Sequence, residues 1–413
     1  MVDLRPAHYP GTISIDSEAT IKENFEKMPF NQIIEALTKP VESSENDSRV
    51  STSEDIICTG TIEEVNELFR NKRWTDGLAI IPPTKEKVEE FLKYVDRSPH
   101  EQIAILPVAN LGATPWSIAV NGVMAGCRPE CMPVLVAAVE AIGDPHYNLS
   151  QIGTTAGVNT FFLINGPIIK KLGFEYGTGV ISRGPNPAIG RALGLIIRNI
   201  AGFLPAEQYM GTFGYIMPFV LAEDEEGSPW EPFHVEHGFG INTSTVTAGG
   251  TFKWGPQIFP SGTDSEGLLK ILCRGIAKTS DPLVIVFGHM QMATVVINPS
   301  VAQAIAHGGY SKQDVEKYLF ENSRATIEEV NLELKYGDGT GSGTTIAKQI
   351  ELGFTPKEWL DRRRSDDTVT AILYPGLIHI VVCGDPVRNK AMVLHSVYTR
   401  PTTKEIKLPA DWA

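Results

Sequence analysis

Two of the five cysteines stand four residues apart in NGVMAGCRPECMPVLVAAVEA, residues 121–141. Pro129 is typical of a first helical turn, so we expect a helix that begins at or just before it, with Cys127 at or near its N-cap. The positive end of the helix and the neighbouring Arg128 would lower the pKa of that thiol toward the reactive thiolate. We therefore interpret Cys127 as a candidate nucleophile or redox thiol.

Cys131 would lie inside the first turns of the same helix, where a small buried apolar side chain is the favoured interpretation. The spacing of the two cysteines is wider than the Cys-x-x-Cys used in redox exchange, and no second pair lies nearby for a structural zinc site. The other three cysteines lie in apolar contexts, and we expect them in the core: Cys58, Cys273 and Cys383.

A second group of reactive residues lies in SPWEPFHVEHGF, residues 228–239, which carries Glu231, His234, Glu236 and His237. A loop this polar is unusual for core packing alone. In extended chain His234 and Glu236 point to one face. This predicts an acid–base pair in which the carboxylate orients the imidazole or takes its own proton. Glu231 is a candidate substrate contact.

Two alternatives stay open for this loop. A metal could be bound by His234, His237 and His289, although the sequence lacks the helical His-Glu-x-x-His spacing. The loop could also be purely structural. His379 and His395 fall in strand patterns and are interpreted as interior or edge histidines.

An anion site is indicated in GPNPAIGRALGLIIRNI, residues 184–200, where Asn186 precedes a helix and Arg191 lies in its first turns. Helix N-termini and arginine both bind carboxylates and phosphates, although an ordinary solvated arginine after a proline turn is the slightly favoured interpretation. Asp76 is a less certain polar contact of the same site. The glycine-rich residues 337–345 lack the lysine of a phosphate loop, so we expect a flexible loop or lid there.

The elements that must position these residues alternate between helical and extended patterns from residue 62 onward. Apolar residues recur at helical spacing in some segments, and short apolar runs suggest strands in others. We expect helices over 62–74, 84–95, 114–126 and 129–143, and strands over 77–82 and 101–108.

An internal similarity suggests how the chain is organised. Residues 159–177 align with residues 292–311, with Ile164-Asn165 over Ile297-Asn298, and each segment follows an apolar helix. We expect an α/β fold of two related helix-strand-strand-helix units around a pseudo-twofold axis, with the ligand site between them. The competing explanation is that strand-Asn-Pro-helix is common punctuation.

This organisation divides the chain into four parts. Residues 1–55 would be an N-terminal arm and mobile linker, and residues 56–180 the first α/β unit. An irregular connecting region, residues 181–262, would carry the polar loop. Residues 263–413 would form the second unit.

The composition limits the class of protein. The 413 residues are 42% hydrophobic and 21% charged, and the formal net charge is −13. This argues against a nucleic-acid partner, which needs clustered lysine and arginine. We find no leader and no apolar run of about 18 residues, so neither secretion nor membrane insertion is expected. The low, odd number of cysteines favours reduced thiols in a cytoplasm.

Several segments together resemble a poorly characterised, mostly bacterial protein family. They are TDGLAIIPPT at 75–84, VNGVMAGCRPE at 120–130, INGPI at 164–168, IGRALGLIIRN at 189–199 and SPWEPFHVEHGF at 228–239, and the resemblance spans roughly 62–402. The family is associated with UGSC-type (seleno)proteins, whose Cys- or selenocysteine-Gly-Ser-Cys motif is similar to the reactive segment of glycine reductase-type selenoproteins. The resemblance therefore implies a thiol or selenol redox protein as partner, and reductive or thiol-dependent chemistry.

Two positions depart from the family pattern. An aromatic residue is usual where Cys131 stands, and an arginine where His237 stands. Cys127, His234 and Glu236 match the pattern. The departures weaken both a dithiol and a metal site that needs all the polar residues of the loop.

From these observations we hypothesise an enzyme acting on a small anionic molecule by reductive or addition/elimination chemistry. Cys127 would be the nucleophile, His234 the acid–base group and Glu236 its orienting carboxylate, with Arg191 as anion anchor. A metal-dependent hydrolase or lyase is the first alternative, and a non-catalytic subunit of a redox complex the second. The cofactor is unknown, and a homo-oligomer is left open.

Overall fold

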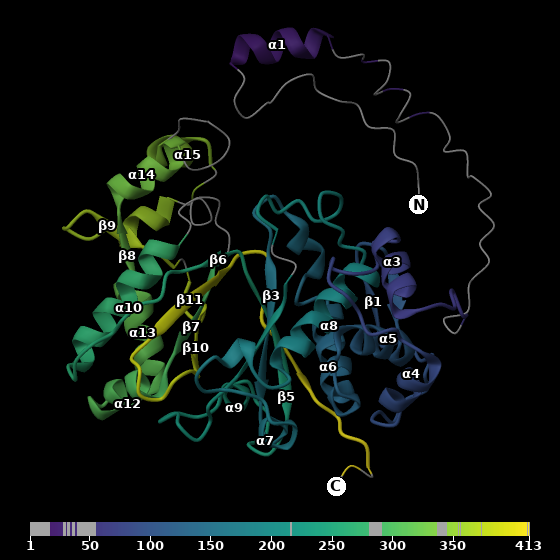
Figure 1. Ribbon diagram of the computed structural model, residues 1–413. Helices are drawn as coiled ribbons and strands as arrows, with labels where there is room; N and C mark the ends of the chain where they lie inside the picture. The colour runs from purple at the N-terminus through teal and green to yellow at the C-terminus, as the bar shows by residue number, and fades with distance from the viewer. Residues whose placement is uncertain are drawn as a thin grey trace.

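The protein folds as a mixed α/β structure in which two four-stranded sheets face each other and helices cover their outer faces (Figure 1). The computed structural model describes residues 17–27, 30, 34, 38, 55–214, 217–280, 291–336, 345–353, 355, 357–372, 374–410 and 412. The predicted α/β class is confirmed. In the described part of the chain, no helix has the length and apolar character needed to cross a membrane.

The first sheet has the strand order β12-β5-β3-β4. Its central strand β3 (Asn159–Asn165) pairs in parallel with β4 (Phe219–Ala222) and antiparallel with β5 (Thr245–Thr251). The edge strand β12 (Thr402–Glu405) pairs antiparallel with β5. β3 is fully buried, and its pairing on both sides sets the register of β4 and β5 and so where these strands begin and end.

The second sheet has the strand order β10-β7-β11-β6. Its strand β7 (Met292–Ile297) pairs in parallel with β10 (Ile378–Val382) and antiparallel with β11 (Ala391–Ser396), and β11 pairs antiparallel with β6 (Lys253–Trp254). The succession of one parallel and two antiparallel pairings is the same as in the first sheet. The pseudo-twofold axis itself stays a prediction.

The two sheets exchange their last strands. β6 follows β5 along the chain but pairs with β11 of the second sheet, and β12 follows β11 but pairs with β5 of the first sheet. The expected boundaries at 181 and 263 therefore do not follow the sheets, since β4 and β5 fall in the expected connecting region. In the first unit the expected helix-strand-strand-helix order differs from the observed one, which is helix, strand, helix in α6-β3-α7. In the second unit α10 precedes β7 and α12 follows it, and residues 281–290 between α10 and β7 lie outside the described chain.

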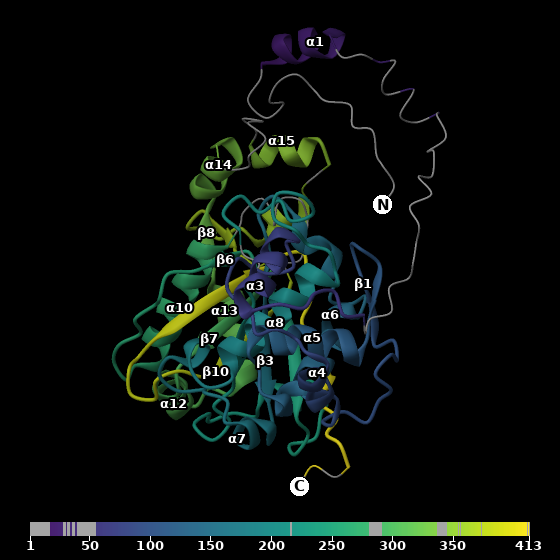
Figure 2. The same cartoon turned by 45° about the vertical axis from the view of Figure 1, so that its right-hand side comes forward.

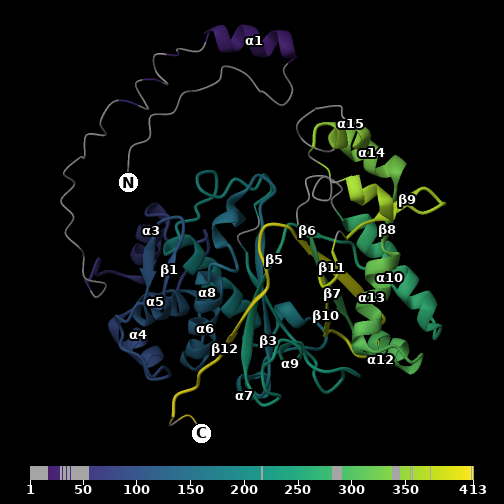
Figure 3. The ribbon, with the colours of Figure 1, turned by 180° about the vertical axis from the view of Figure 1, so that it is seen from behind.

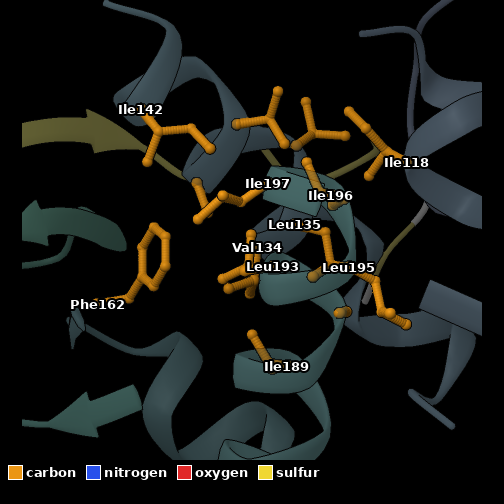
Figure 4. Close-up of a cluster of buried hydrophobic side chains, with 14 of the residues drawn as sticks. Ile118, Val134, Leu135, Ile142, Phe162, Ile189, Leu193, Leu195, Ile196 and Ile197 are labelled. Atoms are coloured by element: carbon orange, nitrogen blue, oxygen red, sulfur yellow. The ribbon is translucent and has the colours of Figure 1, made fainter. Parts of the chain in front are cut away.

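Side chains alternate along the strands and so separate the layers. Phe162 and Ile164 of β3 face helices α5 (Pro115–Ala125), α6 (Met132–Gly143) and α8 (Asn186–Asn199), as the close-up in Figure 4 shows for Phe162. Phe161 and Leu163 point the other way and pack against Val296 of the second sheet. A layer of apolar side chains therefore lies between the two sheets.

Helices α10 (Ser265–Thr279), α12 (Pro299–His307) and α13 (Lys312–Asn322) lie on the second sheet's outer side, opposite α5, α6 and α8 (Figures 2 and 3). Their apolar residues form a separate core with the side chains of β7, β10 and β11 that point away from the first sheet.

The remaining elements are α1 (Glu18–Lys27), α3 (Ile62–Asn71), α4 (Lys85–Leu92), β1 (Ala104–Leu106), β2 (Leu111–Ala113), the 3-10 helices η1 (Pro129–Cys131), η2 (Leu149–Gly153), η3 (Val180–Ser182) and η4 (Lys357–Arg362), α7 (Ile168–Leu172), α9 (Phe233–Glu236), β8 (Arg324–Thr326), α14 (Ile327–Tyr336), α15 (Ile346–Glu351) and β9 (Thr368–Thr370).

Most of the expected N-terminal elements are present. The expected helices correspond to α3, α4, α5 and to η1 with α6, and β1 lies within the expected strand 101–108. The expected strand over 77–82 is wrong, because that apolar segment runs as irregular chain over the end of α5, where Ile81 N–H donates to the Met124 carbonyl.

Candidate functional site

Polar side chains gather where the parallel strands β3 and β4 end. The register of the two strands places Ile164 opposite Ala222, so Asn165 and Glu223 come next to each other at the same sheet edge. Asn165 Nδ2 donates to Glu223 Oε2 at 2.6 Å and to Glu225 Oε1 at 3.0 Å. One amide therefore holds two carboxyl groups.

Glu225 is held a second time by the turn that follows β3. The backbone N–H of Gly166 donates to Glu225 Oε1 at 2.7 Å. Gly166 has φ +85°, and a Cβ there would lie 2.4 Å from the Thr243 carbonyl oxygen, so only glycine fits. The turn thus presents an N–H group to the carboxylate and leaves no room for a side chain.

The short helix α9 brings His234 onto this pair of carboxyl groups. Phe233 packs in the apolar layer between the sheets, and its N–H donates to Glu223 Oε2 at 2.8 Å. The adjacent His234 is fully buried, with its Nδ1 atom 3.5 Å from Glu225 Oε1. In Figure 1, α9 lies between the two sheets, on the side where β3 leads into α7 and β7 into α12.

Four buried polar atoms of this group have no hydrogen-bond partner among the described residues: Glu223 Oε1, Asn165 Oδ1, and Nδ1 and Nε2 of His234. Most buried polar atoms in native proteins are paired, so several unpaired atoms in one place require an explanation. Burial raises the pKa of Glu223, while the ammonium group of Lys312 opposes the shift. The Glu223 carboxyl is therefore biased toward its neutral form, which can donate a hydrogen bond.

The second unit contributes a buried cation. Lys312, the first residue of α13, is 3% exposed, and its Nζ atom lies 2.5 Å from Glu236 Oε2 and 3.3 Å from the Glu231 carbonyl oxygen. Ser311 caps α13 and fixes where this helix begins. Lys312 therefore ties α9 of the connecting region to α13.

Further titratable side chains surround Lys312. Burial, and then the nearby Glu236, raise the pKa of Glu316 to about 7. Burial, His237 and Lys312 lower the pKa of His379 to about 4. The His237 ring stacks on Phe233 with 4.1 Å between ring centroids, and the His237 and His379 rings are 5.9 Å apart. The polar cluster therefore continues from β4 to β10.

The expected pairing of His234 with Glu236 is wrong. Residues 233–236 form a helical turn and not extended chain, so the two side chains leave the backbone in different directions. His234 lies beside Glu225, and Glu236 pairs with Lys312.

Cys127 lies one residue before the N-cap of η1, so its expected place near a helix start is confirmed, but the expected lowering of its thiol pKa is wrong. Helix α5 ends at Ala125, Gly126 adopts the left-handed conformation, and the Cys127 N–H donates to the Gly122 carbonyl, so Cys127 closes the C-terminus of α5. The N-cap of the next turn is Arg128. Burial, followed by Cys131, raises the pKa of the Cys127 thiol well above its ordinary value. The thiolate is therefore disfavoured there.

Cys131 is buried as expected, and burial raises its pKa to about 11. Cys273 and Cys383 are buried as well. Cys58 is half-buried in the irregular chain before α3, so its expected place in the core is wrong.

Arg191 and Asp76 come together, as a single site would require, but they bind each other. Arg191 donates from Nε to Asp76 Oδ2 at 2.9 Å, from Nη2 to Asp76 Oδ1 at 3.0 Å, and from Nη2 to the Ala79 carbonyl at 2.8 Å. Burial alone would raise the pKa of Asp76, but the hydrogen bonds and charge of Arg191, together with hydrogen bonds from Thr75 and the Leu78 N–H, lower it. Most of the donors expected to hold an anion are thus already used.

Asn186 and Glu231 have other surroundings than a substrate site. Asn186 is fully buried, accepts from the Glu175 N–H and donates to the carbonyls of Glu175 and Val220, so it joins α8 to β4. The Glu231 side chain is exposed, and its carbonyl accepts from Lys312. Within the described residues, no hydrogen bond or ion pair joins either residue to His234.

Two further expectations concern residues partly outside the described chain. His289 and most of residues 337–345 lie outside it. Among the residues that the structure describes, no group of three or more His, Cys, Asp or Glu side chains is placed to hold a metal ion. His395 is an interior histidine as expected, with Nε2 2.7 Å from Thr279 Oγ1 and Nδ1 3.0 Å from Gln291 Nε2.

Sequence reasoning missed several members of the cluster, namely Asn165, Glu223, Glu225, Lys312, Glu316 and His379. A signal was present for the first three. Asn165 and Glu223 directly follow two apolar strand segments, and the ends of parallel strands meet at one sheet edge, where ligands often bind. The alignment of Ile164-Asn165 with Ile297-Asn298 predicts a repeated strand, but it does not predict that Asn165 binds two carboxyl groups.

Comparison with protein-family models and with the curated proteins finds no match to this chain. The resemblance to the UGSC-associated family therefore stays a prediction, and the site is interpreted from its own geometry.

Proposed function

We propose that the protein is a small-molecule enzyme that works by general acid–base catalysis in the cluster between the two sheets. His234 and Glu225 would form the acid–base pair, and Glu223 would act as a neutral carboxylic acid beside them. The observation that carries the proposal is the group of buried polar atoms without partners, on Glu223, Asn165 and His234. Convergent polar groups with a perturbed pKa are typical of catalytic sites.

The geometry assigns a role to each group. Glu225 Oε1 lies 3.5 Å from His234 Nδ1 without a hydrogen bond, so a small approach of the two groups when substrate binds would let Glu225 orient the ring and leave Nε2 to exchange a proton with the substrate. Glu223 Oε1 would donate a hydrogen bond to an oxygen on which negative charge develops. These roles suit removal of a proton from a carbon next to a carbonyl group, the first step of many additions and eliminations.

The proposed site is closed to solvent, so substrate entry requires part of the protein to move. His234 and Glu223 are 0% and 1% exposed, so a substrate reaches them only when part of the covering chain moves, and we propose that this part is α9, which carries His234. The Lys312–Glu236 ion pair holds α9 in place. Opening of this contact would therefore accompany substrate entry.

The other hypotheses have less support. Burial disfavours the Cys127 thiolate, which removes the physical reason for thiol chemistry at that position. A small anionic substrate remains part of the proposal, although Arg191 is largely engaged by Asp76.

A cytoplasmic location is also proposed, because the chain has few cysteines and all five are free thiols. A thiol or selenol redox partner rests on the resemblance alone.

The test measures proton exchange, which needs no knowledge of the product. Small oxo-, hydroxy-, amino- and unsaturated carboxylic acids are incubated with the protein in D₂O, and loss of their C–H signals is followed by ¹H NMR. We expect exchange with at least one compound, and about 100-fold slower exchange in His234→Asn. His146→Asn, at an exposed histidine, serves as the control. Absence of exchange with the whole panel, or an unchanged rate in His234→Asn, would refute the proposal.

A further inference from the structure

A cavity of about 320 Å³ lies on the second unit, between α10 and residues 255–259. One face of α10 forms its helical side, with Ile271, Arg274, Lys278 and Thr279 among the lining residues. The volume lies at the lower end of the range of about 300–1,000 Å³ typical of small-molecule sites. None of the residues that line it belongs to the cluster around His234.

The two charged side chains among the described lining residues are both cationic. Arg274 and Lys278 stand one turn apart on α10, so they lie on the same face of the helix. Within the described residues, neither side chain makes a hydrogen bond or ion pair, although the positive charge of Lys278 makes a small contribution to lowering the pKa of Glu329. Lys270 of the same helix differs, because it pairs with Glu266 at 2.9 Å. Among the residues that the structure describes, the lining of the cavity contains no acidic side chain.

An aromatic ring lies at the opposite side of the cavity. Phe259 is 62% exposed, which is unusual for so large an apolar side chain. Hydrogen bonds in both directions between Ile258 and Ala391 place Phe259 near Lys390, whose Nζ atom lies 3.8 Å from the ring centroid. The ring is therefore held in place while part of its surface stays open.

The backbone frame of the cavity is tightly packed. A Cβ on Gly275 would lie 2.1 Å from Ile258 Cδ1, and a Cβ on Gly255 would lie 2.7 Å from Thr279 Cγ2. Segment 255–259 and α10 thus touch at two points where an added Cβ would require the neighbouring side chain to shift. The cavity between them has a defined shape.

We infer that this cavity is a second binding site, and that its ligand is a small anion with a flat apolar ring, such as an aromatic carboxylate. Arg274 and Lys278 would bind the anionic group through charge-assisted hydrogen bonds. Phe259 would stack on the ring. The inference does not depend on the acid–base function of His234.

The test uses benzoate as the probe and the full-length protein, with binding followed by saturation-transfer NMR. We expect saturable binding of benzoate, and binding at least tenfold weaker in Arg274→Gln. Acetate lacks the ring and benzyl alcohol lacks the charge, so each should bind at least tenfold more weakly than benzoate. Phenyl phosphate should compete with benzoate, since it has both parts.

Lys270→Gln is the matched control, because it removes a cation from α10 outside the cavity and should leave benzoate binding within about twofold. Phe259→Ala provides a second variant and should also weaken binding. The inference is overturned if the wild-type protein shows no saturable benzoate binding, or if Arg274→Gln and Lys270→Gln bind benzoate equally well.

Discussion

Burial governs the protonation of single residues around α9. The carboxyl groups of Glu223 and Glu316 have raised pKa values, and the imidazole of His379 has a lowered one, chiefly because water is excluded from them. Lys312 moves all three values in the direction expected of a nearby positive charge. One buried cation therefore influences carboxyl and imidazole groups on three elements.

Glu316 provides a prediction of how stability depends on pH. Its pKa is about 7 in the folded protein and 4.5 ordinarily, so between these values the folded state keeps a proton that the unfolded chain has released. The contribution of Glu316 to the free energy of unfolding therefore falls as the pH rises from about 4.5 to about 7. We expect Glu316→Gln to gain stability relative to the wild type over this interval and to gain no more above it.

Urea unfolding of both proteins at several pH values measures this difference. Glu321→Gln, at an exposed glutamate of the same helix, controls for the loss of one negative charge. A constant difference between Glu316→Gln and the wild type from pH 4.5 to 8 would contradict the prediction.

Cys127 gives a second prediction at the residue scale. Because burial raises the pKa of its thiol, we expect native Cys127 to react with iodoacetamide at pH 7 much more slowly than the half-buried Cys58. Peptide mass spectrometry of samples taken over time reports both rates. Faster modification of Cys127 than of Cys58 would restore the activated-thiol hypothesis.

Element α9 shows what the local sequence could and could not predict. The pattern of polar and apolar residues in 228–239 indicates His234 as a candidate, but its alternation predicts extended chain, and a single helical turn changes which carboxylate lies beside the histidine. Glu225 lies on the turn after β4, and Lys312 comes from α13. Contacts between separate elements depend on the packing of the sheets, which no local pattern contains.

The Lys312–Glu236 pair predicts how firmly α9 is attached. Lys312→Met leaves the largely buried carboxylate of Glu236 without its cation, so we expect the free energy of unfolding to fall by about 3 kcal/mol. The double variant Lys312→Met, Glu236→Gln removes both charges and should recover part of this loss. Urea unfolding provides the values. Equal stability of Lys312→Met and the wild type would show that the pair does not hold α9.

At the scale of the whole molecule, the two sheets are joined by exchanged strands and a shared apolar layer. The alignment of Ile164-Asn165 with Ile297-Asn298 predicted matching strands, and β3 and β7 are indeed the strands that pair both in parallel and antiparallel in their sheets. The exchange of β6 and β12 could not be predicted, because short edge strands carry little pattern of their own. Which sheet β6 or β12 joins depends on where the strand before it ends in space.

The exchange predicts cooperative unfolding. Loss of the first sheet would leave β12 without its partner, and loss of the second would leave β6 without its own. We therefore expect a single calorimetric transition in which the calorimetric and van't Hoff enthalpies agree for the region that holds both sheets. Two separate transitions, one for each sheet, would contradict this expectation.

The central claim is that His234 works with Glu225, which lies beside it, and not with Glu236, which follows it in the sequence. The most direct measurement compares proton exchange in D₂O for Glu225→Gln and Glu236→Gln, each confirmed to be folded, with the compound that the wild-type protein exchanges. We predict that Glu225→Gln lowers the exchange rate at least tenfold more than Glu236→Gln does, because Glu225 lies beside the imidazole whereas Glu236 pairs with Lys312. An equal loss in both variants, or a larger loss in Glu236→Gln, would contradict the account.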